Sequence, residues 1–280
     1  MTATFAPIAS VSPDAHVGQL LKNWRERRRL SQLDLSLQAE VSSRHLSFVE
    51  TGRSQPSREM ILRLSEQLDL PFRERNRLLL AAGFAPVYAE TALDAPPLRA
   101  VRDALRQMLK AHEPYPAVVV DRHWNMVEGN ASLDALTAGF DPALLTNPLN
   151  VYRASLHPDG MARNIVNLGE WRGHLLARLR RQVDASGDVT LARLLDEVRG
   201  YPCDQPVPDV EIPGPGQFVV PLRLRSPDGE LAFFSTVSTF GTPLDITVSE
   251  LVIEAFYPAD DRTATVLARR ATNGQPAAGR

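Results

Sequence analysis

The sequence predicts a two-domain protein, with an all-α N-terminal domain followed by an α+β domain built on an antiparallel sheet. Three observations lead to this prediction. Five short helices with recognisable cap residues fit into residues 16–83. Helical periodicity stops between Phe84 and Pro97, where prolines gather. After Pro213 the apolar residues alternate with a period of two, as they do in half-buried strands.

Length and composition agree with this division. The chain of 280 residues exceeds a typical domain, and 44% hydrophobic with 23% charged residues is ordinary for an ordered globular protein. We therefore expect a first domain over residues 16–85, a linker over 86–97 and a second domain over 98–270. The net charge of −2 gives no global sign of a nucleic-acid partner, so such a function must rest on local charge.

A basic cluster near the N-terminus supplies local charge. Its members crowd the end of the first predicted helix: Lys22, Arg25, Arg27, Arg28 and Arg29. This pattern favours a polyanionic partner, although a solvated helix face would show it as well.

Cysteine content and hydropathy predict a cytoplasmic protein. Cys203 is the single cysteine of the sequence, so no internal disulfide can form, and we interpret it as a buried or bystander thiol. No apolar run approaches the roughly 18 residues that span a bilayer. The first residues also lack the basic and then apolar pattern of a signal peptide.

Apolar spacing and cap residues define the five N-terminal helices. The first, over residues 18–29, has an apolar face made of Leu20, Leu21 and Trp24. Serine caps begin the next three helices, at Ser31, at Ser42 or Ser43, and at Ser57. Gly52 ends the third helix, because glycine readily adopts the left-handed conformation. Pro71 opens the fifth, where its missing N–H costs nothing.

The second and third helices, joined by a tight turn at Glu40 and Val41, have the order of a helix-turn-helix. In that motif the second helix lies in the major groove, with its N-terminal residues at the base edges. The stretch LSQLDLSLQAEVSSRHLSFVETGRSQPS resembles the Cro and lambda-repressor class, also called the xenobiotic-response-element (XRE) type. The resemblance rests on the LSQ start, the small Ala39, the polar leading turn, ETGR and the PS before the next helix.

This resemblance implies a set of DNA-contacting residues and a double-stranded DNA operator as partner. It places Gln32 at a phosphate, Ser43, Arg44 and Ser47 at base edges, Thr51 and Arg53 at the backbone, Ser42 at the helix cap and His45 along the groove. Arg44 is the best candidate for a bidentate guanine contact, typically worth about 1–3 kcal/mol of discrimination. Ser43 replaces the glutamine of the family at the start of the reader helix. The alternative for Arg44 is a surface arginine in a helix pair that binds protein.

The C-terminal part predicts a layered α+β arrangement. Helices are expected over residues 98–108, 161–184 and 189–198, and strands over 117–120, 124–128, 218–225, 231–240 and 248–257. The turn SPDG joins the third and fourth strands as a hairpin. In the last strand Leu251, Ile253 and Ala255 are expected to face the opposite way from Glu250 and Glu254. A five-stranded antiparallel sheet with helices against one face encloses space for a ligand.

This order is similar to that of small-molecule sensor domains of the PAS kind. The stretch PLNVYRASLHPDGMARNIVNLGEWRGHLLARLRRQV resembles the sensor half of MmyB-like transcription regulators, in which a PAS-like ligand-binding domain follows a Cro-type helix-turn-helix. Together the two resemblances cover nearly all of residues 18–268. The segment GTPLDITVSELVIEAFYPADDRTATVLA departs from the simpler end common in the family. The resemblance implies a DNA-binding regulator that senses a fatty acid or another small apolar ligand, and we expect a homodimer.

Candidate pocket residues come from the same half of the chain. They are Trp124, Asn130, Arg153, Trp171, Phe218, Phe233 and Phe234. Plain core packing is the alternative for each aromatic residue. Arg153 or Arg163 could meet a ligand carboxylate, with a surface ion pair as the alternative.

The sequence gives no support for catalysis, a metal or a cofactor. The histidines have no metal-binding spacing, and no glycine-rich phosphate loop or nucleophile elbow is present. We therefore expect a protein that is not an enzyme. Two alternatives to a ligand-responsive regulator stay open: a C-terminal domain that only dimerises or recruits a protein partner, and a helix-turn-helix used for protein contact alone.

Overall fold

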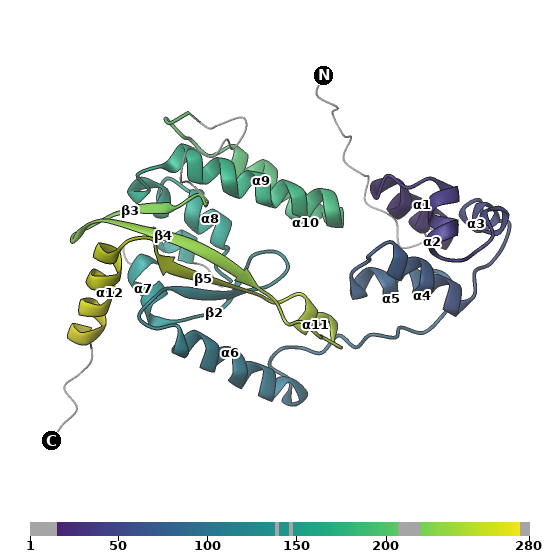
Figure 1. The fold of residues 1–280 in the computed structure, drawn as a ribbon, viewed down its shortest axis with the longest axis horizontal. Helices are drawn as coiled ribbons and strands as arrows, with labels where there is room; N and C mark the ends of the chain where they lie inside the picture. Colours follow the sequence, from purple (N-terminus) through teal and green to yellow (C-terminus); the bar gives the residue numbers. More distant parts are fainter. Residues whose placement is uncertain (1–15, 138–139, 146–147, 207–218, 275–280) are drawn as a thin grey trace. The chain divides into compact units, whose positions relative to one another are not determined.

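The computed structural model describes residues 16–137, 140–145, 148–206 and 219–274 (Figure 1). The chain forms two compact units. One comprises Met1–Thr91 together with Thr242–Ser249, and the other comprises Ala92–Gly241 and Glu250–Arg280. Two domains with an all-α and an α+β architecture confirm the predicted fold class.

The first unit contains the five predicted helices. They are α1 (Val17–Arg27), α2 (Gln32–Gln38), α3 (Ser43–Glu50), α4 (Arg58–Gln67) and α5 (Phe72–Ala81). The side chains of Ser31, Ser42 and Ser57 accept backbone N–H groups and cap α2, α3 and α4. Gly52, just after α3, has a φ of 74°, the left-handed conformation predicted from the sequence.

A buried apolar cluster holds these helices together. Leu21, Leu35, Leu46 and Ile61 are fully buried in it. Of the three alternating leucines of α2, only Leu35 faces this core, because a helix turns residues two positions away to another side. The other two, Leu33 and Leu37, are 58% and 70% exposed.

The first unit also contains a segment from much later in the sequence. Thr242–Ser249 belongs to it and forms the short helix α11 (Ile246–Ser249), which packs against α5. The Ile246 N–H donates to the Ala89 carbonyl at 2.8 Å, and the Asp245 carboxylate accepts the N–H groups of Thr91 and Thr247. The prediction of a strand starting at residue 248 is therefore wrong, because Asp245 caps a helical turn there.

Replacing Ile246 by alanine is expected to lower the free energy of unfolding of the first unit by about 2 kcal/mol. Ile246 is 2% exposed, so its removal leaves a cavity in a segment that can partly relax. Leu244→Ala is the matched control, because Leu244 is 86% exposed, and it is expected to cost less than about 0.5 kcal/mol. Hydrogen exchange of the α5 amides measures both effects; equal protection in the two variants would contradict the prediction.

The second unit is built on the predicted five-stranded antiparallel sheet. Its strands are β1 (Ala117–Val120), β2 (Met126–Gly129), β3 (Leu222–Ser226), β4 (Gly229–Ser238) and β5 (Val252–Pro258). They lie in the order β2-β1-β5-β4-β3, with every neighbouring pair antiparallel. The central strand β5 pairs Glu254 with Val118 of β1 and Val237 of β4. Paired residues share a face of the sheet, so Glu254 lies on the same side as Val118.

Helices pack on both faces of this sheet rather than on one. The side of Val118 and Val120 meets the larger core, to which α8 (Val151–Leu156), α9 (Leu168–Ser186) and α10 (Val189–Arg199) contribute. The side of Ala117 and Val119 meets Leu105 of α6 (Arg99–Ala111). Figure 1 shows α9 and α6 on opposite sides of the strands. The remaining helices of this unit are α7 (Ala131–Thr137) and α12 (Asp261–Gly274), besides 3-10 turns at Pro96–Leu98, Pro142–Leu145 and Met161–Asn164.

The helix predicted over residues 161–184 is interrupted. Met161–Asn164 is a 3-10 turn, and α9 begins only at Leu168. Between them Ile165 bridges to β3, and the Val166 N–H donates to the carbonyl of Arg223 at 2.8 Å. Asn167 completes the contact by accepting the Arg223 N–H at 3.1 Å. Backbone pairing with a distant strand thus overrides the helical periodicity of this stretch.

Candidate DNA-binding and ligand sites

The leading turn of α3 is the exposed part of the helix-turn-helix. Ser43, Arg44 and His45 are exposed, whereas Leu46 is buried against the core. The Ser42 hydroxyl accepts the His45 N–H at 3.2 Å and is the N-cap. The guanidinium carbon of Arg44 lies 5.4 Å from the Phe48 ring centroid, one turn further on. This stacking holds the positive charge along the exposed side of the helix.

The other predicted DNA-contacting residues surround this turn. Ser47 is half-buried, and its carbonyl accepts the Thr51 hydroxyl at 2.8 Å. Arg53 is exposed after the end of α3. The half-buried Gln32 donates to the Glu50 carboxylate at 2.8 Å, which fixes its amide between α2 and α3.

A buried ion pair sets the position of α3 against α1. Arg25 Nε lies 2.7 Å from Glu50 Oε1 and Arg25 Nη2 lies 2.8 Å from Glu50 Oε2, a bidentate pair. The two side chains are 9% and 1% exposed. The Glu50 hydrogen bond raises the pKa of Arg25 above its ordinary value, although burial acts in the opposite direction. A third N–H of Arg25 donates to the Leu30 carbonyl, so the guanidinium also fixes the α1–α2 turn.

Much of the predicted basic cluster serves the fold in this way. Besides Arg25, Arg28 donates to the carbonyls of Leu68 and Asp69, and Lys22 pairs with Glu26 at 3.9 Å. Arg44 lies outside the cluster on the exposed turn. Exposed positive charge remains at Arg29 after α1, at Arg44 on the leading turn of α3 and at Arg53 after α3.

The second unit encloses a cavity of about 60 Å³ between its sheet and its helices. Its wall is almost entirely apolar, with contributions from the sheet (Val118, Met126, Leu222), from α7 (Leu133, Leu136), from α8 (Val151, Tyr152) and from α9 (Trp171, Leu175). Phe140, Leu149 and Met161 close it from the connecting segments. A concave apolar site with few polar groups is the usual form of a small-molecule pocket.

Three polar side chains meet in the cavity wall. Arg178 Nη1 donates to Glu254 Oε1 at 2.9 Å, and Arg178 Nε donates to the Tyr152 hydroxyl at 3.0 Å. The Arg178 and Glu254 side chains are 18% and 5% exposed. Burial acts to lower the pKa of Arg178, but the charge of Glu254 acts in the opposite direction, and the net effect is a raised pKa. The guanidinium therefore stays protonated. Burial raises the pKa of the Tyr152 hydroxyl, which therefore stays neutral.

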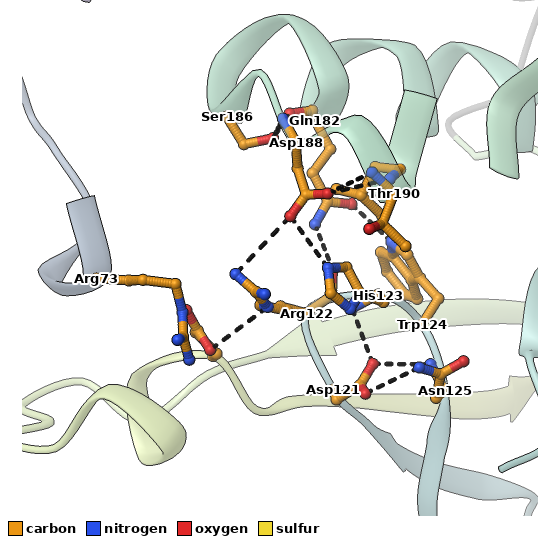
Figure 2. A network of polar contacts seen from close by, with 12 residues as sticks. Arg73, Asp121, Arg122, His123, Trp124, Asn125, Gln182, Ser186, Asp188 and Thr190 are labelled. Atoms are coloured by element: carbon orange, nitrogen blue, oxygen red, sulfur yellow. Dashed lines mark hydrogen bonds and ion pairs between the residues drawn. The ribbon is translucent and has the colours of Figure 1, made fainter. Parts of the chain in front are cut away.

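The turn between β1 and β2 places Trp124 behind this wall. Asp121 accepts the backbone N–H groups of His123 and Asn125, and Trp124 adopts a φ of 65°, which bulky residues rarely do. Its indole N–H donates to Gln182 of α9 at 2.6 Å, as Figure 2 shows. The Trp124 ring stacks under the Arg178 guanidinium, 4.3 Å from its carbon.

Contacts with Asp188, the N-cap residue of α10, also hold the turn between β1 and β2 in place (Figure 2). His123 Nε2 lies 3.0 Å from Asp188 Oδ2, and Arg122 lies 3.8 Å from the same carboxylate. Burial acts to raise the pKa of Asp188, but the His123 hydrogen bond and the N-terminal N–H groups of α10 lower it overall. The turn that carries Trp124 is thus held from two helices.

The predicted pocket residues occupy different places. Trp171 lines the cavity, and its indole N–H donates to Ser155 at 3.2 Å. Trp124 supports Arg178 from behind, and Phe233 lies fully buried in the surrounding core. Phe234 stacks on Tyr257, with ring centroids 5.3 Å apart.

The predicted polar pocket residues have partners within the fold. Asn130 accepts the Ala117 N–H and donates to the Tyr115 carbonyl, which fixes the start of α7. Arg153 forms a bidentate pair with Glu197 at 2.7 Å, and its side chain is 44% exposed. Arg163 lies exposed on a 3-10 turn. Phe218 lies outside the described residues.

Sequence reasoning missed the polar wall of the cavity. Glu254 faces the opposite way from Ile253 and Ala255, as predicted, but its side of the sheet, that of Val118, is buried as well because helices cover both faces. A signal was present, because Arg178 follows Trp171 and Leu175 at spacings of seven and three and so shares their helix face. A charged residue on an apolar stripe requires a buried partner, and Glu254 is that partner.

Among the described residues, no group of three or more His, Cys, Asp and Glu side chains is arranged to hold a metal ion. In the same ranges, no helix has the length and apolarity needed to cross a bilayer.

Two protein-family models match the sequence of this chain. The family described as MmyB-like transcription regulator ligand binding domain matches residues 101–269, which is more than half of the chain. The chain belongs to this family. A helix-turn-helix family model matches residues 21–75, so both resemblances predicted from the sequence are confirmed.

Similar proteins carry matching descriptions. Uncharacterized HTH-type transcriptional regulators of Mycobacterium tuberculosis and Mycobacterium bovis are 30% identical to the chain over 189 residues. The match covers 65% of this chain and 66% of each relative, slightly under two thirds of their length.

Proposed function

We propose that this protein is a sequence-specific DNA-binding transcription regulator whose C-terminal domain binds a small apolar ligand. The observation that carries the DNA part is the exposed turn of Ser43, Arg44 and His45, capped by Ser42 and held against a rigid helical core. The apolar cavity, in a domain of the MmyB-like ligand-binding family, supports the ligand part.

A homodimer fits this function. Helix-turn-helix proteins commonly read two half-sites about one turn of DNA apart, which requires two reader helices at a fixed spacing. A ligand that binds one arrangement of the dimer better than another would shift that spacing and the affinity for DNA. Sedimentation equilibrium of the full chain tests the dimer, and a monomer that binds a palindromic site tightly would contradict it.

Arg44→Ala is expected to weaken binding to the preferred operator by about 10- to 100-fold, because a bidentate base contact is worth about 1–3 kcal/mol. The operator is first selected from random DNA duplexes with the full chain, and Kd is then measured at constant salt. Arg99→Ala is the matched control: it removes the same charge from α6 of the other unit, where the side chain is 80% exposed. Equal affinities of the two variants would instead favour a helix-turn-helix that contacts protein.

The ligand part has its own test. The purified chain is extracted with organic solvent, and the extract is analysed by mass spectrometry for a stoichiometric small molecule. DNA affinity is measured before and after extraction. A bound apolar compound whose removal changes DNA affinity would support a sensor, whereas an empty protein with unchanged affinity would favour a C-terminal domain that only dimerises.

A further inference from the structure

The cavity wall holds two charged groups among the described residues, and they neutralise each other. Arg178 and Glu254 form a two-bond pair at 2.9 and 3.3 Å. The pair sits beside carbon atoms of Val118, Leu175 and the other apolar lining residues. The polar part of the wall therefore offers no net charge to a ligand.

The guanidinium is already largely occupied. Besides its two bonds to Glu254, it donates to the Tyr152 hydroxyl and stacks on the Trp124 ring. A ligand carboxylate could reach Arg178 only by displacing Glu254 or by lying beside it. Displacement would leave the Glu254 carboxylate buried without a partner, and neighbouring carboxylates in a poorly hydrated site repel each other. Either arrangement penalises an anionic head group.

An uncharged head group avoids this penalty. A hydroxyl can donate to the outer lone pairs of Glu254 or accept one of the remaining N–H groups of Arg178, and the ion pair stays intact. The apolar body of the ligand would then replace empty space next to Leu133, Leu136 and Trp171.

The cavity volume restricts the size of the ligand. An apolar cavity of about 150 Å³ takes up benzene. The present cavity, at about 60 Å³, is smaller, so a long acyl chain would require its walls to move apart. Short-chain compounds are therefore the appropriate probes.

We propose that this cavity selects ligands with a compact apolar body and an uncharged, hydrogen-bonding head group over carboxylates of the same chain length. The proposal rests on the proposed function, in which this domain binds a small molecule. It assigns Arg178 and Glu254 together as the residues that determine specificity for the head group.

The test compares matched pairs of ligands: 1-propanol with propanoate, and 1-butanol with butanoate. Titration calorimetry of the full chain at about pH 8, where carboxylic acids are ionised, gives the four values of Kd. The alcohol of each pair is expected to bind at least about tenfold more tightly, a difference of about 1.4 kcal/mol, because only the carboxylate is repelled by the charge of Glu254. Carboxylates that bind as tightly as the alcohols, or more tightly, would overturn the proposal.

Glu254→Gln tests whether the charge of Glu254 causes the preference for uncharged head groups. This variant keeps the shape of the side chain and removes its charge, so that Arg178 becomes an uncompensated cation in the cavity wall. The preference is expected to reverse, with butanoate binding more tightly than 1-butanol. Glu197→Gln is the matched control, since it opens the equivalent pair with Arg153 outside the cavity and should leave the preference unchanged.

The outcomes separate this proposal from the proposed function. Binding by none of the four probes, together with an empty organic extract, would contradict a ligand-binding role and the specificity proposal with it. Binding with the carboxylates preferred would keep the ligand-binding role and overturn the specificity alone. Near-UV circular dichroism shows whether Glu254→Gln folds. If it does not, the Kd values of the alcohols and carboxylates for the unaltered chain still test the proposed specificity.

Discussion

Gly18→Ala is expected to destabilise the first unit by about 3 kcal/mol or more and to abolish DNA binding with it. A Cβ atom at position 18 would lie 2.0 Å from the Val49 carbonyl oxygen and 3.0 Å from the Glu50 Cα. Both are backbone atoms of α3, so α1 and α3 would have to move apart. The intrinsic preference of alanine for a helix returns at most about 1 kcal/mol. Crowding therefore outweighs propensity here.

The measurement is urea unfolding of the full chain, with hydrogen exchange of the α1 and α3 amides to assign the transition to the first unit. Gly241→Ala is the control, because a Cβ at Gly241 would meet no atom within 4 Å. It is expected to change the unfolding free energy by less than about 0.5 kcal/mol. If Gly18→Ala proved as stable as the unaltered chain, the close approach of α1 and α3 would be refuted.

Glu50→Ala is expected to cost about 3–5 kcal/mol, the usual loss when one partner of a buried ion pair is removed. Arg25 would stay charged and 9% exposed without its carboxylate, and Gln32 would lose its acceptor. Glu90→Ala is the matched control in the same unit. The pair of Glu90 with Arg73 is partly exposed, at 52% and 27%, so its loss is expected to cost under about 1 kcal/mol.

A double variant distinguishes two causes of the destabilisation: the loss of attraction between Arg25 and Glu50, and the burial of an Arg25 charge without a partner. Replacing Arg25 by methionine together with Glu50 by leucine removes both charges and keeps comparable volume. Most of the stability is expected to return, as it does when apolar residues replace other buried pairs. Chemical denaturation of the single and double variants gives the coupling energy. A cost for Glu50→Ala no greater than that for Glu90→Ala would mean that the pair does not hold α3 against α1.

Elements with local signals could be predicted from the sequence. The caps at Ser31 and Ser57 act on residues within one helical turn, so neighbouring residues suffice to locate α2 and α4. The hairpin of β3 and β4 follows from a short turn between alternating strands, and α3 follows from its spacing and the stop at Gly52. The same local pattern placed Ser43 and Arg44 on an exposed turn.

Elements that depend on distant partners could not be predicted. Ile165 and Val166 leave a helical pattern because β3 offers backbone hydrogen bonds, and that strand lies more than 50 residues further along the chain. Thr242–Ser249 joins the first unit through contacts with α5 and with Thr91. In both cases the pairing energy comes from groups that no short window of sequence contains.

The sequence by itself determined the two-domain order, the helix-turn-helix and the antiparallel sheet, since periodicity and capping act over a few residues. Only the tertiary structure decided the character of the cavity. Alternation placed Glu254 opposite Ile253 and Ala255, but it could not show that this side of β5 is also covered by helices, among them α9. There a buried carboxylate persists because Arg178 compensates its charge. The partner lies 76 residues away in the sequence, so folding alone brings the two charges together.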